Sequence, residues 1–176
     1  MAWVFGLSAE CGPDERKAER LAQYFKTRAC VLANGDRCQC RADTFQDIEE
    51  NWWCRVCPDK IGEVGIDAPD SAYWMTELGI WFYQQLCSAP AFRYALVGVE
   101  VDEFRTYREL LEDAASLPIA GLVLSVELSQ VLGLGTDLHS FSAGYVWYPY
   151  EGEVYNPLMT SPVLKHKLNA LLAVTS

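Results

Sequence analysis

Basic residues are scarce in this sequence. Its 176 residues include 14 Lys plus Arg against 24 Asp plus Glu, a formal net charge of −10 at pH 7. Nucleic-acid phosphates and anionic membrane surfaces attract clustered Lys and Arg, so the charge disfavours direct binding to either one. The sequence also lacks an apolar run of the roughly 20 residues that a membrane-spanning helix needs. A signal peptide has Lys or Arg before its apolar run, and here none precedes the first apolar run. We therefore expect a soluble, cytoplasmic protein.

Motifs that identify an active site are missing as well. His139 and His166 are the only histidines, and neither belongs to an HExxH or Cys-His pattern. Gly133-Leu134-Gly135 lacks the third glycine and the preceding strand of a dinucleotide site. We assign no catalytic residues, and the sequence predicts a protein that is not an enzyme.

Apolar residues, in contrast, are plentiful, at 51% of the chain with 12% aromatic. This length fits one domain, and a domain of this size buries roughly 70% of the surface that its unfolded chain exposes. Residue periodicity predicts these strands: 2–7, 29–33, 37–41, 92–102, 119–125 and 141–148. It predicts helices over these ranges: 13–28, 43–52, 71–87, 102–115, 126–132 and 161–173.

The order of these elements predicts the fold class. Asn34-Gly35 is a strong hairpin signal, and the regular strand-helix alternation of a parallel sheet is absent. We expect one α+β domain over residues 1–176, in which an antiparallel or mixed sheet packs against aromatic-rich amphipathic helices.

Seven cysteines are spread along the chain, an odd number that argues for reduced thiols rather than a disulfide framework. Cys38-x-Cys40 and Cys54-x2-Cys57 together supply four sulfurs, the number of ligands of a structural zinc ion. Only the second pair has the usual zinc-ribbon spacing. The alternative is that these are ordinary buried thiols, in which case the protein needs no cofactor.

The segment Trp53-Cys54-Arg55-Val56-Cys57 resembles the Trp-Cys-x-x-Cys segment of thioredoxin-like proteins. The resemblance implies thiol-redox chemistry at a first cysteine of low pKa. It covers five residues only, and the preceding residues 43–52 are acidic and patterned as a helix. Nearby carboxylates raise a thiol pKa, which argues against this chemistry.

Two groups of residues are candidates for contact with a partner. Glu100 and Asp102 alternate with Val99 and Val101 on a predicted strand, so both carboxylates should leave the same face, next to Glu103. They could hold a cation, but a solvated sheet edge is the simpler interpretation. In the second group, Tyr145 and Trp147 should point inward, whereas a Pro- and Gly-containing loop mixes tyrosines with carboxylates, as interface hot spots do: Tyr148, Tyr150, Glu151, Glu153 and Tyr155.

The negative charge is concentrated in two segments. Residues 43–77 hold nine acids and two bases, and residues 94–160 hold ten acids and two bases, whereas both ends of the chain are mildly basic. An acidic face of this kind docks a basic protein quickly. We expect a non-catalytic binding module that neutralises a basic toxin or effector, such as a nuclease, as small bacterial immunity proteins and antitoxins do. The alternative is a zinc-binding or thiol-redox protein that uses the four cysteines.

Overall fold

The computed structural model describes the chain except for residues 1–4, 60–68, 102–103, 136, 154–156 and 176. Its strands are β1 (Phe5–Glu10), β2 (Ala29–Val31), β3 (Arg37–Gln46), β4 (Trp52–Pro58), β5 (Tyr94–Val99), β6 (Val123–Ser125), β7 (His139–Ser142) and β8 (Tyr145–Trp147). Its α-helices are α1 (Glu15–Lys26), α2 (Pro69–Leu86), α3 (Tyr107–Glu112), α4 (Val126–Val131), α5 (Pro157–Thr160) and α6 (Pro162–Thr175). The predicted single α+β domain is confirmed.

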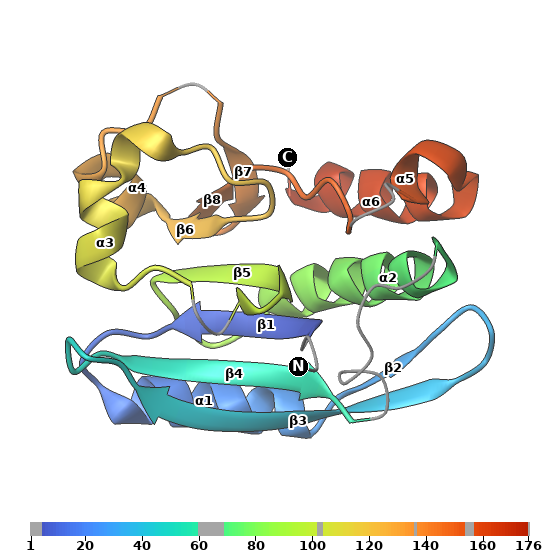
Figure 1. Ribbon diagram of the computed structural model, residues 1–176, viewed down its shortest axis with the longest axis horizontal. Coiled ribbons are helices and arrows are strands. Elements are labelled where there is room, and N and C mark those ends of the chain that lie inside the picture. The colour runs from blue at the N-terminus through green and yellow to red at the C-terminus, as the bar shows by residue number, and fades with distance from the viewer. Residues whose placement is uncertain (1–4, 60–68, 102–103, 136, 154–156, 176) are drawn as a thin grey trace.

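The eight strands form one sheet in the order β2-β3-β4-β1-β5-β6-β8-β7, and every pairing is antiparallel. β1 lies between β4 and β5, and all six of its residues are buried. Figure 1 shows the β3–β4 hairpin near α3 at one end of the molecule and the β2–β3 hairpin at the other end.

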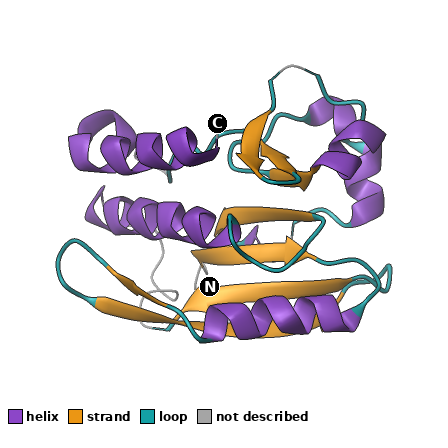
Figure 2. Ribbon diagram, turned by 180° about the vertical axis from the view of Figure 1, so that it is seen from behind, coloured by secondary structure: helices purple, strands orange, loops and turns teal. Residues whose placement is uncertain are grey.

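Each face of the sheet carries its own apolar core. Leu7 and Val97 belong to the larger core, which also contains the inner faces of α1, α2 and α6. Tyr94 and Leu124 point to the opposite face, where a smaller core includes Leu110 of α3 and Leu128 of α4. Figure 2 shows the helices from behind. The largest helix of the described chain, α2, therefore lies away from the face that α3 and α4 cover.

Local sequence explains where the helices begin. Asp14 precedes α1, and its side chain accepts a hydrogen bond from the Arg16 N–H at 3.0 Å. Thr106 and Glu109 form a reciprocal capping box at the start of α3. This cap places the start of α3 later than the predicted helix over 102–115. None of the helices in the described ranges is long and apolar enough to cross a membrane.

The predicted helix over 43–52 is wrong. β3 continues through Gln46, a turn follows, and β4 begins at Trp52. The helical spacing of Phe45 and Trp52 is coincidental, because Phe45 lies opposite Trp53 in the β3–β4 ladder and the two rings stack 6.0 Å apart. Pairing with a second strand therefore decides the structure of this segment.

Other strand boundaries differ from the prediction. The strand over 92–102 ends at Val99, because Glu100 has a left-handed backbone with φ 57°. The strand over 141–148 is instead the hairpin β7–β8, whose turn contains Gly144 with φ 85°. The predicted strand over 119–125 is limited to β6.

Candidate functional site

The turn between β3 and β4 is held rigidly by one carboxylate. The Asp47 side chain accepts hydrogen bonds from the N–H groups of Glu49 at 2.9 Å and Asn51 at 3.0 Å. Its second oxygen accepts a hydrogen bond from the Trp53 indole at 2.8 Å. Two backbone hydrogen bonds also close the turn: the Asp47 N–H donates to the Asn51 carbonyl, and the Glu50 N–H donates to the Asp47 carbonyl. The turn is thus fixed in one conformation, which lowers the entropic cost of binding through it.

Ile48 lies in this turn, directly after Asp47. Its side chain is 93% exposed, more than any other large apolar residue in the described part of the chain. Glu49 and Glu50 follow it directly. An exposed aliphatic residue on a fixed turn, flanked by carboxylates, has the make-up of an interface anchor with a charged rim.

The turn also joins the two acidic segments of the sequence. The Glu49 carboxylate accepts a hydrogen bond from the Arg108 N–H at 3.1 Å, which links residues 43–77 to α3 in residues 94–160. Glu109 and Glu112 of α3 are exposed. We call Ile48, Glu49 and Glu50, together with these two α3 carboxylates, the acidic tip.

Of the predicted pair Glu100 and Asp102, Glu100 lies outside any strand, because β5 ends at Val99. Glu100 is exposed in the turn after β5, while Asp102, like Glu103 and Tyr155, lies outside the described residues. Val99 pairs with the start of β1 and Trp53 pairs with its end, so Glu100 lies at the opposite end of β1 from the acidic tip.

Tyr148 and Tyr150, two of the tyrosines expected in an exposed loop, are buried. Tyr148 packs in the core beneath α3 and α4, and Tyr150 packs against Tyr83 of α2 with ring centroids 5.0 Å apart. The expectation that these rings form an open surface is therefore wrong. Glu151 is exposed between them and Glu153, and its contact with a partner, like that of Glu100, stays a prediction.

Glu153 is half-buried, and its polar groups form hydrogen bonds within the protein. Its carboxylate accepts a hydrogen bond from the Tyr150 hydroxyl at 2.5 Å, and its N–H donates to the Thr76 hydroxyl at 3.0 Å. Burial raises the pKa of Glu153, and the bond from Tyr150 only partly offsets this effect. Ionisation of Glu153 therefore costs folding free energy.

We expect Glu153→Gln to change how stability depends on pH. Because the pKa of Glu153 is raised on folding, its contribution to stability is complete below the unfolded value of 4.5 and is lost as pH rises through the folded value. The amide can still accept from Tyr150 but does not ionise. Urea unfolding across pH should show the variant gaining on the wild type as pH rises. A constant difference between the two would contradict this.

The four cysteines predicted to bind zinc do not converge. Cys40 lies opposite Pro58 in the β3–β4 ladder, four residues along β4 from Cys54, a separation of about 13 Å. Cys57 lies opposite the exposed Arg41 and so points to the other face of the sheet from Cys38 and Cys40. Within the described ranges, no three His, Cys, Asp or Glu residues are placed to hold a metal ion. The predicted zinc site is not formed.

Four of the seven thiols, that of Cys54 among them, also lack the environment of a redox site. Cys54 is fully buried within β4 rather than exposed at a helix start, and burial raises its pKa well above the ordinary value. Burial raises the pKa of Cys11, Cys30 and Cys40 to about 12. A reactive thiol has a low pKa and is accessible, so these cysteines fit ordinary packing.

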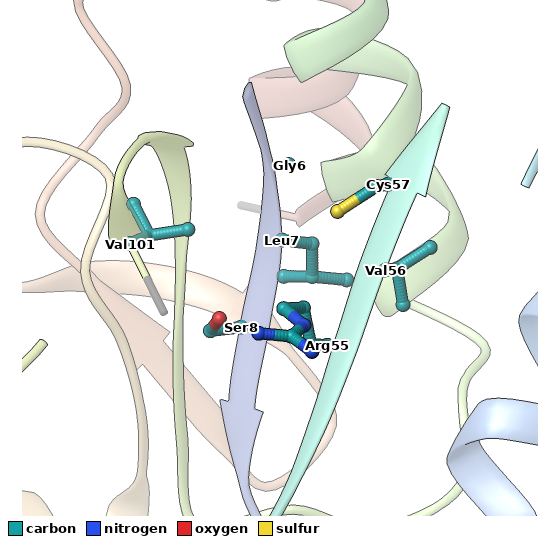
Figure 3. A pocket seen from close by; sticks show the side chains of 7 residues that line it. All are labelled: Gly6, Leu7, Ser8, Arg55, Val56, Cys57 and Val101. Atoms are coloured by element: carbon teal, nitrogen blue, oxygen red, sulfur yellow. The ribbon is translucent and has the colours of Figure 1, made fainter. Parts of the chain in front are cut away.

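Two hollows remain. The larger, about 630 Å³, lies between the end of β1 and α4, but groups in its wall already bond within the protein: Arg93 to Glu10, and the Tyr145 hydroxyl to Phe92. Figure 3 shows the smaller, about 10 Å³, beside Ser8, whose buried hydroxyl has no partner among the described residues. That volume is enough for one water molecule and not for a ligand.

Sequence reasoning missed Ile48 as a functional candidate because it placed this residue on the apolar face of a helix. The signal that could have found it was the segment 47–51, in which every residue except Ile48 is polar, between two aromatic strand-like segments. Asp and Asn favour turns because their side chains bond nearby backbone groups.

Comparisons of the chain with protein-family models, with curated protein sequences and with solved structures find no match.

Proposed function

We propose that the protein is a non-catalytic, acidic binding module that acts in the cytoplasm, of the immunity or antitoxin type, and that it inhibits a basic partner through the acidic tip. The observation that carries the proposal is the exposure of Ile48 on a turn that Asp47 holds rigid. Single exposed apolar residues are common on protein surfaces. The rigid turn and the neighbouring carboxylates are what make Ile48 a candidate anchor.

The charge around Ile48 indicates the chemistry of the partner. Glu49 and Glu50 follow Ile48 in the chain, and the hydrogen bond from Arg108 to Glu49 brings the turn next to α3, which carries the exposed Glu109 and Glu112. The complementary surface is an apolar pocket with a rim of Lys and Arg. A nuclease fits this description, because its cleft must be basic to bind phosphates, and an acidic tip inserted there would exclude the nucleic acid.

The test begins with capture of proteins from the source organism on the immobilised chain, followed by purification of the bound partner. We expect a one-to-one complex whose association slows as salt is raised, and whose partner loses its activity on binding. Ile48→Asp should weaken the complex by roughly 30-fold or more, the effect of a hot-spot residue. Glu49→Lys with Glu50→Lys should reduce the association rate by about tenfold.

Matched variants locate the surface. Val163→Asp places the same charge at another exposed apolar residue, on α6, and should leave affinity unchanged. Glu100→Lys and Glu151→Lys test the other predicted contacts. If these two variants weaken the complex and the Ile48 variant does not, the acidic tip is the wrong surface. A partner that keeps its activity in the complex would contradict inhibition.

A further inference from the structure

β2 forms one edge of the sheet, and its outward peptide groups can be identified from the hydrogen bonds of β3. The Asp59 N–H donates to the Gln39 carbonyl at 2.9 Å, and the Asp59 carboxylate accepts a hydrogen bond from the Gln39 N–H at 3.2 Å. The peptide groups of Gln39 thus point away from β2. Ala29 lies opposite Gln39, so it is in a non-hydrogen-bonded pair and its own peptide groups point outward. The same holds two residues later, at Val31.

Within the described ranges, these outward groups have no hydrogen-bond partner along most of β2. Ala33, next in the same alternation, donates its N–H to the Glu77 carboxylate at 2.8 Å. No described residue forms a hydrogen bond with the N–H or carbonyl of Ala29 or Val31 outside the strand ladder. The Val31 side chain is 64% exposed. Among the described residues, two donors and two acceptors of β2 therefore have no partner, and a further strand could pair with them.

Helix α2 runs beside this edge. Glu77 meets the Ala33 end of β2, and Gln85 accepts a hydrogen bond from the Arg28 guanidinium at 3.0 Å at the other end. The helix is thus antiparallel to β2, with a hollow of about 170 Å³ between them. We call this hollow the β2–α2 groove; it is lined by Cys30, Val31, Ile80, Trp81, Gln84 and the ion pair of Glu77 with Lys167.

We propose that the β2–α2 groove binds an extended peptide segment of a partner protein by strand addition. The segment pairs with Ala29 and Val31 through four backbone hydrogen bonds and places an apolar side chain against Ile80 and Trp81. An uncharged side chain fits here because Glu77 and Lys167 neutralise each other at 2.7 Å. The contacts that close both ends of the groove restrict the added strand to a few residues.

This interaction goes beyond the proposed inhibition and is independent of it. The β2–β3 hairpin and the β3–β4 hairpin with its acidic tip lie at opposite ends of the molecule (Figure 1). One chain can therefore hold a basic partner at one end and an extended segment at the other.

A library of phage-displayed short linear peptides tests the proposal on the full chain. We expect selected peptides to shift the NMR signals of the Ala29 and Val31 amides and of the Trp81 indole in a saturable way. Val31→Pro removes one outward N–H and leaves the β2–β3 bonds, which come from Cys30, in place. It should weaken binding by about tenfold, the loss of roughly one hydrogen bond. Val31→Thr keeps the N–H and should bind as the wild type does.

N-methylated peptides keep the test decisive if the proline variant fails to fold. Methylation of alternate peptide nitrogens should abolish binding in one register, where N–H groups face β2, and have little effect in the other. The proposal is overturned if no peptide is selected, if both registers respond equally, or if the shifted signals lie at the acidic tip.

Discussion

Replacing Arg93 by Ala should lower the free energy of unfolding by about 3–5 kcal/mol at neutral pH, as loss of one partner of a buried ion pair does. The Glu10 side chain is 0% exposed and accepts hydrogen bonds from Arg93 Nε at 2.8 Å and from Arg93 Nη2. The Gly12 N–H donates to it at 2.5 Å. Burial raises the pKa of Glu10, while Arg93 acts to lower it. Without Arg93, a carboxylate in the central strand has no opposite charge.

The pair of Arg105 with Asp113, in which the carboxylate is 47% exposed, provides a matched control. Arg105 Nε and Asp113 Oδ2 are 2.9 Å apart. Each arginine also lies over an aromatic ring: Arg105 over Phe104, and Arg93 over Tyr107. Arg105→Ala should cost less than about 1 kcal/mol, because Asp113 is solvated. The cost of Arg93→Ala should shrink as pH falls and Glu10 takes a proton. Urea unfolding of both variants measures these losses of free energy of unfolding. Equal losses for Arg93→Ala and Arg105→Ala would mean that the burial of Glu10 does not make its ion pair more important than an exposed one.

The parts of this fold that could be predicted are those with local causes. Asp14 and the apolar spacing of Leu21 and Phe25 specify α1 without help from other elements. Asn34-Gly35 specifies the β2–β3 turn, because Gly35 has φ 91°, a conformation that glycine adopts without strain. The predicted α+β class followed from such segments.

The parts that could not be predicted depend on distant residues. Tyr150 is buried because Gly79 of α2 leaves room for its ring; a Cβ at Gly79 would lie 2.6 Å from the Tyr150 hydroxyl. Nothing near Tyr150 in the sequence signals this space. Ile48 is exposed because β3 and β4 pair on either side of its turn, and a helix-like spacing hid that pairing. The two acidic segments that meet at the acidic tip were predicted, but none of the residues of the acidic tip was among the predicted partner contacts.

Gly121→Ala should destabilise the protein by about 2–5 kcal/mol, from two separate causes. Gly121 has φ 86°, and this left-handed region costs other residues roughly 1–2 kcal/mol. A Cβ here would also overlap the Tyr83 hydroxyl. That hydroxyl donates to the Gly121 carbonyl at 2.9 Å and accepts from the Val97 N–H at 3.3 Å, so it cannot move away freely. Crowding of a packed core typically adds about 1–3 kcal/mol.

Gly133→Ala separates the two causes. Gly133 has φ 64°, and no atom of the described residues lies within 4 Å of the position that a Cβ would take, so this variant should show the backbone cost alone. Adding Tyr83→Phe to Gly121→Ala removes the overlapping oxygen, and the double variant should be more stable than the sum of the single effects indicates. Tyr83 is held by Trp147 at 5.1 Å and Phe141 at 6.2 Å, so the ring cannot relieve the overlap by rotating away. Additive effects in thermal and urea unfolding would show that the backbone, and not Tyr83, makes glycine necessary at this position.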